Sequence, residues 1–407
     1  MLSSEWYFLG DALDLFVAPS AIPSLVGKPS GGDLWLFQKL TLRAETGSHF
    51  RQNDIFANNR FDSGGQVLQS CAAMMTEATP DALRTLLCGL GTVIRDTVLA
   101  ERRGHDAASL SAVAAQAGGD TIYAVDKFSE KAIISWFGAH WPAEWPVEVV
   151  MEGIEHDLCF PQGTPVADTH WKCLLDPIDG TRGFMYDKRS AWALGGIAPQ
   201  AAEDTMLSQI VAAAMTEIPT SKQWRADQLS AAIDGPLIAQ GFDVRAGGTT
   251  TLDFKPSKAT TFAHGFSSLV KYFPEGRTLT AQIEERLWDE LIGLNSTPSP
   301  TIFDDQYIST GGQFYEMING HDRMLGDLRP LVFRTLDMES SLVCHPYDAC
   351  TALLLQKAGI VYEHPLGEFP DAPLDTSSGV AWVAYANQHL ASIARPVLQK
   401  ILRQFLT

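Results

Sequence analysis

The chain has 407 residues, of which 45% are hydrophobic and 19% charged, as is typical of a globular protein with a sizeable core. Its formal net charge of −18 argues against a nucleic-acid partner, because no run of Lys and Arg offsets the repulsion from phosphate groups. No uninterrupted apolar run reaches the length of a membrane-spanning helix, so we expect no membrane partner either.

The N-terminal residues and the cysteines indicate a compartment. The first twenty residues have neither the basic start nor the continuous apolar stretch of a secretion signal. The six cysteines are scattered without a C-x-x-C pair, which in a long chain favours reduced thiols. We therefore expect a cytoplasmic protein.

The chain is predicted to have three parts. Residues 1–78 contain no motif, and we treat them as an N-terminal extension of unknown role: an extra lobe, an oligomerisation arm or an upstream translation artefact. Residues 79–200 are predicted to form an N-terminal α+β half, and residues 201–407 a C-terminal α/β half with insertions.

The first predicted helix follows this extension directly. Thr79 suits an N-cap and Pro80 the first helical position, and apolar residues at helical spacing continue the pattern to Arg103. The other elements expected in this half are a strand over 121–125, a helix over 127–137, and strands over 147–151 and 171–175.

The second half shows the same alternation. The expected elements are a strand over 208–214, helices over 281–292, 312–319 and 348–357, a strand over 380–385, and a final helix over 387–406 with a kink at Pro396. Because strands and helices alternate without an internal repeat, the sequence predicts a layered α/β architecture.

Three predicted strands in the first half end in carboxylates, at Asp126, Glu152 and Asp176. The last begins the segment Asp-Pro-Ile-Asp-Gly-Thr, which reads as a tight acidic turn leading into a short helix at Thr181. Two aspartates three residues apart across such a turn can point at one spot and bind a hard cation such as Mg²⁺. Each of these features has a structural alternative when taken alone. The segment can be an acidic capped turn, Glu152 can be a solvated strand end, and Asp348 can be an ordinary helix cap.

The combination and order of these segments resemble the inositol monophosphatase superfamily. The segment LLDPIDGTRGF matches its D-P-[IL]-D-G-T signature; DTIYAVDKFSEKAI and VEVVMEG precede it, and a G-x-D and HPYDACTALLLQKAG follow it. The resemblance covers roughly residues 79–407. It implies an α-β-α-β-α sandwich and a Mg²⁺-dependent phosphatase that hydrolyses a small phosphate monoester through a metal-activated water.

The resemblance also implies ligands for two or three Mg²⁺ ions. Glu152 and Asp176 would bind one ion together with the carbonyl of Ile178. Asp176 would bridge to a second ion, which Asp179 and Asp348 would hold.

Further residues receive catalytic roles from the same resemblance. Asp126 would support a third, weaker ion, directly or through water. Glu152 and Thr181 would orient the attacking water.

The substrate pocket is implied at two segments. Its candidate residues are Gly180, Thr181, Arg182, Ser309, Thr310 and Gly311. For residues 309–311 a plain helix-start turn is an equal alternative. Arg182 either reaches a second phosphate, which guanidinium binds in a bidentate manner, or faces solvent.

Three functions stay open at this point. The first is a phosphatase for a small phosphorylated metabolite of the sugar, polyol or inositol type, although Ser341 stands where inositol specialists have a glutamate. The second is a 3′(2′),5′-bisphosphate nucleotidase, since T-R-G-F resembles the T-K-G-F of some members. The third, motivated by Gly153 and Ser341, is an inactive metal-binding homologue that acts through a partner. The resemblance further implies a homodimer.

Overall fold

The computed structural model describes residues 78–104, 113–117, 120–154, 158–201, 205–294, 296, 299–338 and 342–406. All of them belong to one compact unit that extends from Phe61 to Thr407. Three predictions lie outside the described residues. They are the extension over 1–78, except for its last residue, any contact of the Asp126 side chain, and the comparison made at Ser341.

The larger sheet has eight strands in the order β10-β9-β8-β7-β6-β5-β3-β4. Strands β3 and β5 are parallel, and every other neighbouring pair is antiparallel. The strands are β3 (Val147–Met151), β4 (Leu158–Phe160), β5 (Trp171–Asp179), β6 (Ala191–Pro199), β7 (Ala212–Ile218), β8 (Arg225–Ala232), β9 (Ile238–Asp243) and β10 (Thr249–Leu252).

Helices cover both faces of this sheet. On one face, α2 (Pro80–Gly104) packs on β6, β7 and β8, and α4 (Ala124–His140) packs on α2 and β5. On the other face, α7 (Thr310–Ile318), α9 (Pro346–Ala349) and α10 (Ala352–Ala358) contact strands from β5 to β8. Side chains of β5 alternate accordingly: Cys173 and Leu175 join the core under α2, and Leu174 joins the core on the opposite face. The central strands are therefore buried on both sides.

The smaller sheet has five strands in the order β12-β11-β13-β15-β14. They are β11 (Gly265–Leu269), β12 (Ile302–Phe303), β13 (Asp322–Asp327), β14 (Val361–Glu363) and β15 (Trp382–Tyr385). Helices α7 and α10 contact β13 and β14 of this sheet as well as the larger one, so they form a shared middle layer. The outer layer comprises α6 (Arg277–Ile292), α8 (Arg329–Thr335) and α11 (Gln388–Phe405).

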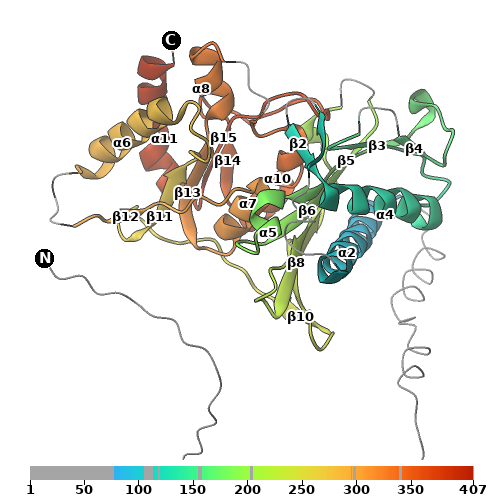
Figure 1. Ribbon diagram of the computed structural model, residues 1–407. Helices are drawn as coiled ribbons and strands as arrows, with labels where there is room; N and C mark the ends of the chain where they lie inside the picture. Colours follow the sequence, from blue (N-terminus) through green and yellow to red (C-terminus); the bar gives the residue numbers. More distant parts are fainter. Residues whose placement is uncertain are drawn as a thin grey trace, which may run out of the picture. The chain divides into compact units, whose positions relative to one another are not determined.

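This arrangement confirms the predicted α-β-α-β-α sandwich (Figure 1). The middle layer packs closely on the smaller sheet: the buried Phe314 of α7 lies edge-on to the buried Trp382, with ring centroids 5.2 Å apart. The remaining short elements are a hairpin of β1 (Val113–Ala117) and β2 (Asp120–Tyr123), the helix α5 (Thr181–Met185), and 3₁₀ turns over Val166–Asp168 and Leu207–Gln209. No helix in the described ranges is both long and apolar enough to cross a membrane.

Several predicted boundaries were wrong. The strand expected to end at Asp126 ends at Tyr123, so Asp126 lies in the first turn of α4 rather than at a strand end. The strand expected over 208–214 begins only at Ala212, because the preceding residues form a 3₁₀ turn whose backbone N–H at Met206 is capped by the Gln209 side chain at 2.8 Å. The helix expected over 348–357 is divided into α9 and α10.

Candidate active site

The end of β5 supplies two carboxylates, and a bulge aims both at one place. The predicted turn directly after Asp176 was wrong: β5 continues to Asp179. Asp176 lies opposite Leu194 of β6, whereas Asp179 lies opposite Trp192, so three steps along β5 match two along β6. In a regular strand, residues three apart face opposite sides of the sheet. Because the bulge adds one residue between them, Asp176 and Asp179 point to the same side of the sheet. Bulges often redirect a side chain in this way next to a functional site.

The turn predicted at Gly180 is present one residue after the strand. Gly180 has φ +91°, and a Cβ there would lie 3.0 Å from Cβ of Ser309, so both conformation and space require glycine. The chain then enters α5 at Thr181, as predicted. The Thr181 hydroxyl donates a hydrogen bond to the carbonyl of Ile178 at 2.7 Å, which fixes that carbonyl beside the two aspartates.

A third carboxylate, Asp348, joins them from α9. Each of Asp176, Asp179 and Asp348 contributes one carboxylate oxygen to a cluster, and these three oxygens lie within 4.8 Å of one another. Backbone N–H groups orient Asp176 and Asp348. Oδ1 of Asp176 accepts a hydrogen bond from the N–H of Ile178 at 3.0 Å, and Oδ2 of Asp348 accepts one from the N–H of His345 at 2.6 Å. The structure therefore brings together three of the carboxylates that the sequence nominated as metal ligands.

Asp179 is held by the start of α7. Its Oδ2 accepts hydrogen bonds from the Ser309 hydroxyl at 2.8 Å and the Gly311 N–H at 2.5 Å, and its Oδ1 accepts from the Thr310 N–H at 3.3 Å. The helix expected over 312–319 begins two residues earlier, at Thr310, with Ser309 as its N-cap, so these residues form the helix start that was one of their two alternatives. The structure places all three against a candidate metal ligand, an arrangement that the sequence did not predict.

The electrostatics of the cluster favour a bound cation. Burial, and then the charges of Glu152, Asp179 and Asp348, raise the pKa of Asp176 well above its usual value. Burial and the charge of Asp348 raise the pKa of Asp179 to about 7. Neither Asp176 nor Asp179 forms an ion pair with a lysine or arginine within the described ranges. Buried carboxylates without a cationic side chain as partner fit a hard divalent ion, which prefers such oxygen ligands.

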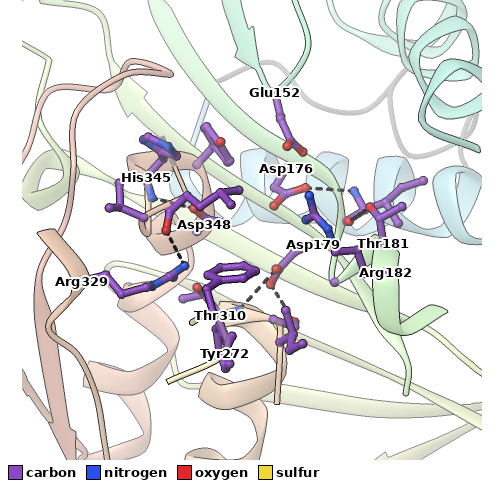
Figure 2. A pocket seen from close by; sticks show the side chains of 18 residues that line it. Glu152, Asp176, Asp179, Thr181, Arg182, Tyr272, Thr310, Arg329, His345 and Asp348 are labelled. Atoms are coloured by element: carbon purple, nitrogen blue, oxygen red, sulfur yellow. Dashed lines mark hydrogen bonds between the residues drawn. The ribbon is translucent and has the colours of Figure 1, made fainter. Parts of the chain in front are cut away.

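The carboxylates face a single cavity (Figure 2). Glu152, the fourth candidate ligand from the sequence, lines the same cavity. Thr181 and Arg182 lie on one side, and Tyr272 and Arg329 lie on another side. The lining residues are Glu152, Asp176, Ile178, Asp179, Gly180, Thr181, Arg182, Tyr272, Phe273, Ile308, Ser309, Thr310, Arg329, Leu342, Val343, His345, Tyr347 and Asp348.

The wall formed by Tyr272, Phe273 and Arg329 was missed in the sequence. The Arg329 guanidinium is paired with Asp327, with Nη2 and Oδ2 2.5 Å apart, and its Nη1 donates to the Leu342 carbonyl at 2.8 Å. The Tyr272 ring lies 5.3 Å from the guanidinium carbon and the Phe273 ring 5.7 Å from it. No motif or spacing marks these residues, because only the tertiary fold brings them to the cavity.

The Tyr272 hydroxyl is the one polar group of this wall that is buried without a hydrogen-bond partner among the described residues. Such a group is costly unless a ligand or water completes it. His345, in contrast, is used within the protein: its Nδ1 lies 2.9 Å from the Ser378 carbonyl and its ring stacks on Tyr347.

Comparison with known proteins identifies the architecture. No protein-family model matches the sequence, and no curated protein matches it. Among solved structures, SuhB of Mycobacterium tuberculosis aligns with a TM-score of 0.52 at 16% identity, over 81% of this chain and 100% of that one. The extragenic suppressor protein SuhB of Bartonella henselae aligns with a TM-score of 0.52 at 14% identity, over 78% and 99% of the two chains.

A third solved structure extends the likeness to a sugar bisphosphatase. Fructose-1,6-bisphosphatase of Leishmania major in its holo form aligns with a TM-score of 0.57 at 11% identity, over 84% of this chain and 98% of that one. These proteins are members of the inositol monophosphatase superfamily. At such identities the likeness establishes the fold. This chain therefore has the fold of the inositol monophosphatase superfamily, as its D-P-I-D-G-T segment predicts.

Proposed function

We propose that this protein is a Mg²⁺-dependent phosphatase that hydrolyses a small phosphate monoester of the sugar, polyol or inositol type. The observation that carries the proposal is the cluster of Asp176, Asp179 and Asp348, which offer one oxygen each within 4.8 Å of one another and line one cavity. The fold of phosphatases such as fructose-1,6-bisphosphatase supports the assignment.

The residues that would hold the ions are those nominated from the sequence. Glu152, Asp176 and the Ile178 carbonyl would hold one ion, and Asp176, Asp179 and Asp348 the other. When bound, Mg²⁺ supplies acidification of a coordinated water and neutralisation of the phosphoryl charge. The third ion at Asp126 stays a prediction from the resemblance.

Residues on the cavity wall would orient the attacking water and bind the substrate. Glu152 lines the cavity next to the metal candidates and serves as the group that orients the attacking water, together with Thr181. Arg182, on the same side, is placed to attract the phosphoryl group, since guanidinium and phosphate form charge-assisted hydrogen bonds. Gly180 allows the chain to turn there.

The wall of Tyr272, Phe273 and Arg329 is proposed to contact the alcohol part of the ester. Because Asp327 neutralises the Arg329 guanidinium, this wall offers aromatic surface and hydrogen-bond donors rather than a strong net charge. The Tyr272 hydroxyl, which is buried without a partner among the described residues, would donate to an oxygen of the substrate when binding uncovers it.

Replacing Tyr272 with phenylalanine tests this contact. We expect kcat/KM for the preferred ester to fall roughly tenfold, the worth of one hydrogen bond of about 1.4 kcal/mol. The free energy of unfolding without substrate is expected to stay the same or rise, because a buried hydroxyl without a partner is removed. Steady-state kinetics and urea denaturation measure the two quantities.

Tyr362→Phe is the matched control. The Tyr362 hydroxyl is also buried without a partner among the described residues, but it does not line the cavity. Its removal should leave kcat/KM unchanged. Equal kinetics for Tyr272→Phe and the wild-type protein would contradict the contact.

The function itself is tested by phosphate release from a panel of esters, in the presence of Mg²⁺ and of EDTA. The panel contains inositol 1-phosphate, fructose 1,6-bisphosphate, several sugar monophosphates and adenosine 3′,5′-bisphosphate. We expect turnover of at least one sugar, polyol or inositol ester with Mg²⁺ and none with EDTA. Turnover that persists in EDTA would contradict the proposal.

The panel also decides a second candidate, a 3′(2′),5′-bisphosphate nucleotidase. Arg182 lines the cavity beside Thr181, and for such a substrate its guanidinium would bind the second phosphate instead of the phosphoryl group that is hydrolysed. Preferential hydrolysis of adenosine 3′,5′-bisphosphate would select this candidate over the first. Binding of Mg²⁺ without turnover of any ester would select the inactive homologue instead.

A further inference from the structure

The two oxygens of Asp179 are used differently by the protein. Oδ2 accepts two short hydrogen bonds, from the Ser309 hydroxyl at 2.8 Å and the Gly311 N–H at 2.5 Å. Oδ1 has only the longer contact with the Thr310 N–H, at 3.3 Å. Asp179, Ser309, Thr310 and Gly311 are all buried. Oδ2 is therefore committed to α7, and Oδ1 retains the capacity to bind a cation.

We propose that Ser309 is a positioning residue of the metal centre, whose hydroxyl holds Asp179 so that Oδ1 is presented to the ion. The inference rests on the metal-binding part of the proposed function. It also replaces the substrate-contacting role that the resemblance implied for Ser309.

The hydroxyl group is suited to this role because it can accept one hydrogen bond and donate another at the same time. Ser309 Oγ accepts a hydrogen bond from the Gly312 N–H at 2.8 Å while it donates to Asp179. A carboxylate at position 309 would cap the helix equally well but has no proton to donate. The cap thus fixes the direction of the oxygen, and the remaining proton is aimed at Asp179.

The close approach of α7 depends on a second residue. A Cβ at Gly311 would lie 2.6 Å from Cδ2 of Leu194 and 3.0 Å from Oδ2 of Asp179. Leu194 belongs to a buried central strand, so its side chain has little room to move. Any side chain at position 311 would push the start of the helix away from the carboxylate. The same contact can therefore be weakened by two chemically unrelated substitutions.

The test is a Mn²⁺ titration of the EDTA-treated full-length protein, with free Mn²⁺ followed by electron paramagnetic resonance. Ser309→Ala is expected to weaken Mn²⁺ binding by about tenfold, the usual effect of removing a hydrogen-bond partner of a metal ligand. Ser309→Thr, which keeps the hydroxyl, should bind within about threefold of the wild-type protein. Gly311→Ala should bind more weakly, as Ser309→Ala does.

Ser190→Ala is the matched control. The Ser190 hydroxyl also donates to a buried carboxylate, Glu217, at 2.6 Å, but that pair lies outside the metal cluster. We expect this variant to bind Mn²⁺ like the wild-type protein, although both alanine variants lose a buried hydrogen bond. Circular dichroism checks that each variant is folded.

Three results would overturn the proposal: unchanged Mn²⁺ affinity in folded Ser309→Ala, an equal loss in Ser190→Ala, or a Ser309→Thr variant as weak as Ser309→Ala. If Ser309→Ala does not fold, unchanged affinity in Gly311→Ala overturns it. The readout is independent of turnover. Wild-type protein that binds Mn²⁺ but hydrolyses no ester would refute the proposed function alone, whereas an active enzyme with unaffected Ser309→Ala binding would refute this inference alone.

Discussion

Asp176→Asn is expected to reduce Mg²⁺-dependent phosphate release by roughly a thousandfold or more, which corresponds to about 4 kcal/mol of transition-state stabilisation. Asp176 is 2% exposed and is the one carboxylate proposed to touch both ions. An amide cannot replace its charge, so both ions would be bound more weakly and the charge on the phosphoryl group would be less neutralised. Release of phosphate from the preferred ester at saturating Mg²⁺ measures the effect.

The matched control for this prediction is Asp227→Asn. Asp227 is also 2% exposed, but it pairs with Arg225, with Nε and Oδ1 2.7 Å apart, and does not line the candidate site. The control variant should keep its activity as long as it is folded. If Asp176→Asn retains more than a tenth of the wild-type rate at saturating Mg²⁺, the assignment of the site is wrong.

Asp179→Asn is expected to stabilise the metal-free protein at pH 8, by about 1–3 kcal/mol in the free energy of unfolding. The cause is burial of Asp179, and after it the like charge of Asp348, which together raise the pKa of Asp179 from 3.8 to about 7 on folding. A carboxyl with a raised pKa in the folded state destabilises that state when ionised. The penalty is absent below pH 3.8, grows between pH 3.8 and 7, and is constant above pH 7. The gain from the amide is reduced because Ser309 and Gly311 lose one charged acceptor.

Urea denaturation in EDTA across this pH range measures the difference between the two proteins. The advantage of the variant should grow as the pH rises toward 7 and then level off. Saturating Mg²⁺ should reverse the order, because the ion stabilises the wild-type site more strongly. A variant that is less stable than the wild-type protein at pH 8 in EDTA would contradict the electrostatic account of the cluster.

The positions of Glu152 and Asp348 in the fold could be predicted because each lies next to or within a regular element that has local signals. Glu152 directly follows β3, whose bounds match the prediction, and Asp348 lies in a helix start marked by Pro346. The D-P-I-D-G-T segment then identified the fold, which the solved structures support. Local sequence was therefore enough to predict the position of a residue that depends only on its own strand or helix.

The course of β5 could not be predicted from the same segment. Pro177 and two aspartates indicate a turn, but pairing with β6 extends the strand to Asp179 through a bulge. A proline is tolerated at such a bulge because one ladder position is already irregular. Here tertiary pairing overrides local preference, and this override is what brings Asp176 and Asp179 to one side.

The cavity wall and the support of Asp179 depend on contacts between distant segments. Tyr272 and Arg329 are 57 positions apart and share no spacing rule with the signature, so nothing in their local sequence marks them. Ser309 was nominated by resemblance as a substrate residue, yet its hydroxyl bonds Asp179, 130 positions away. Such pairings arise when separate elements pack together.

A crystal of the protein grown with MnCl₂ and inorganic phosphate shows whether the carboxylate cluster is a metal centre. We expect anomalous difference peaks within coordination distance of Asp176, Asp179 and Asp348, with phosphate in the cavity beside Thr181 and Arg182. Density for phosphate and well-ordered carboxylates without an anomalous peak between them, at millimolar Mn²⁺, would contradict this expectation.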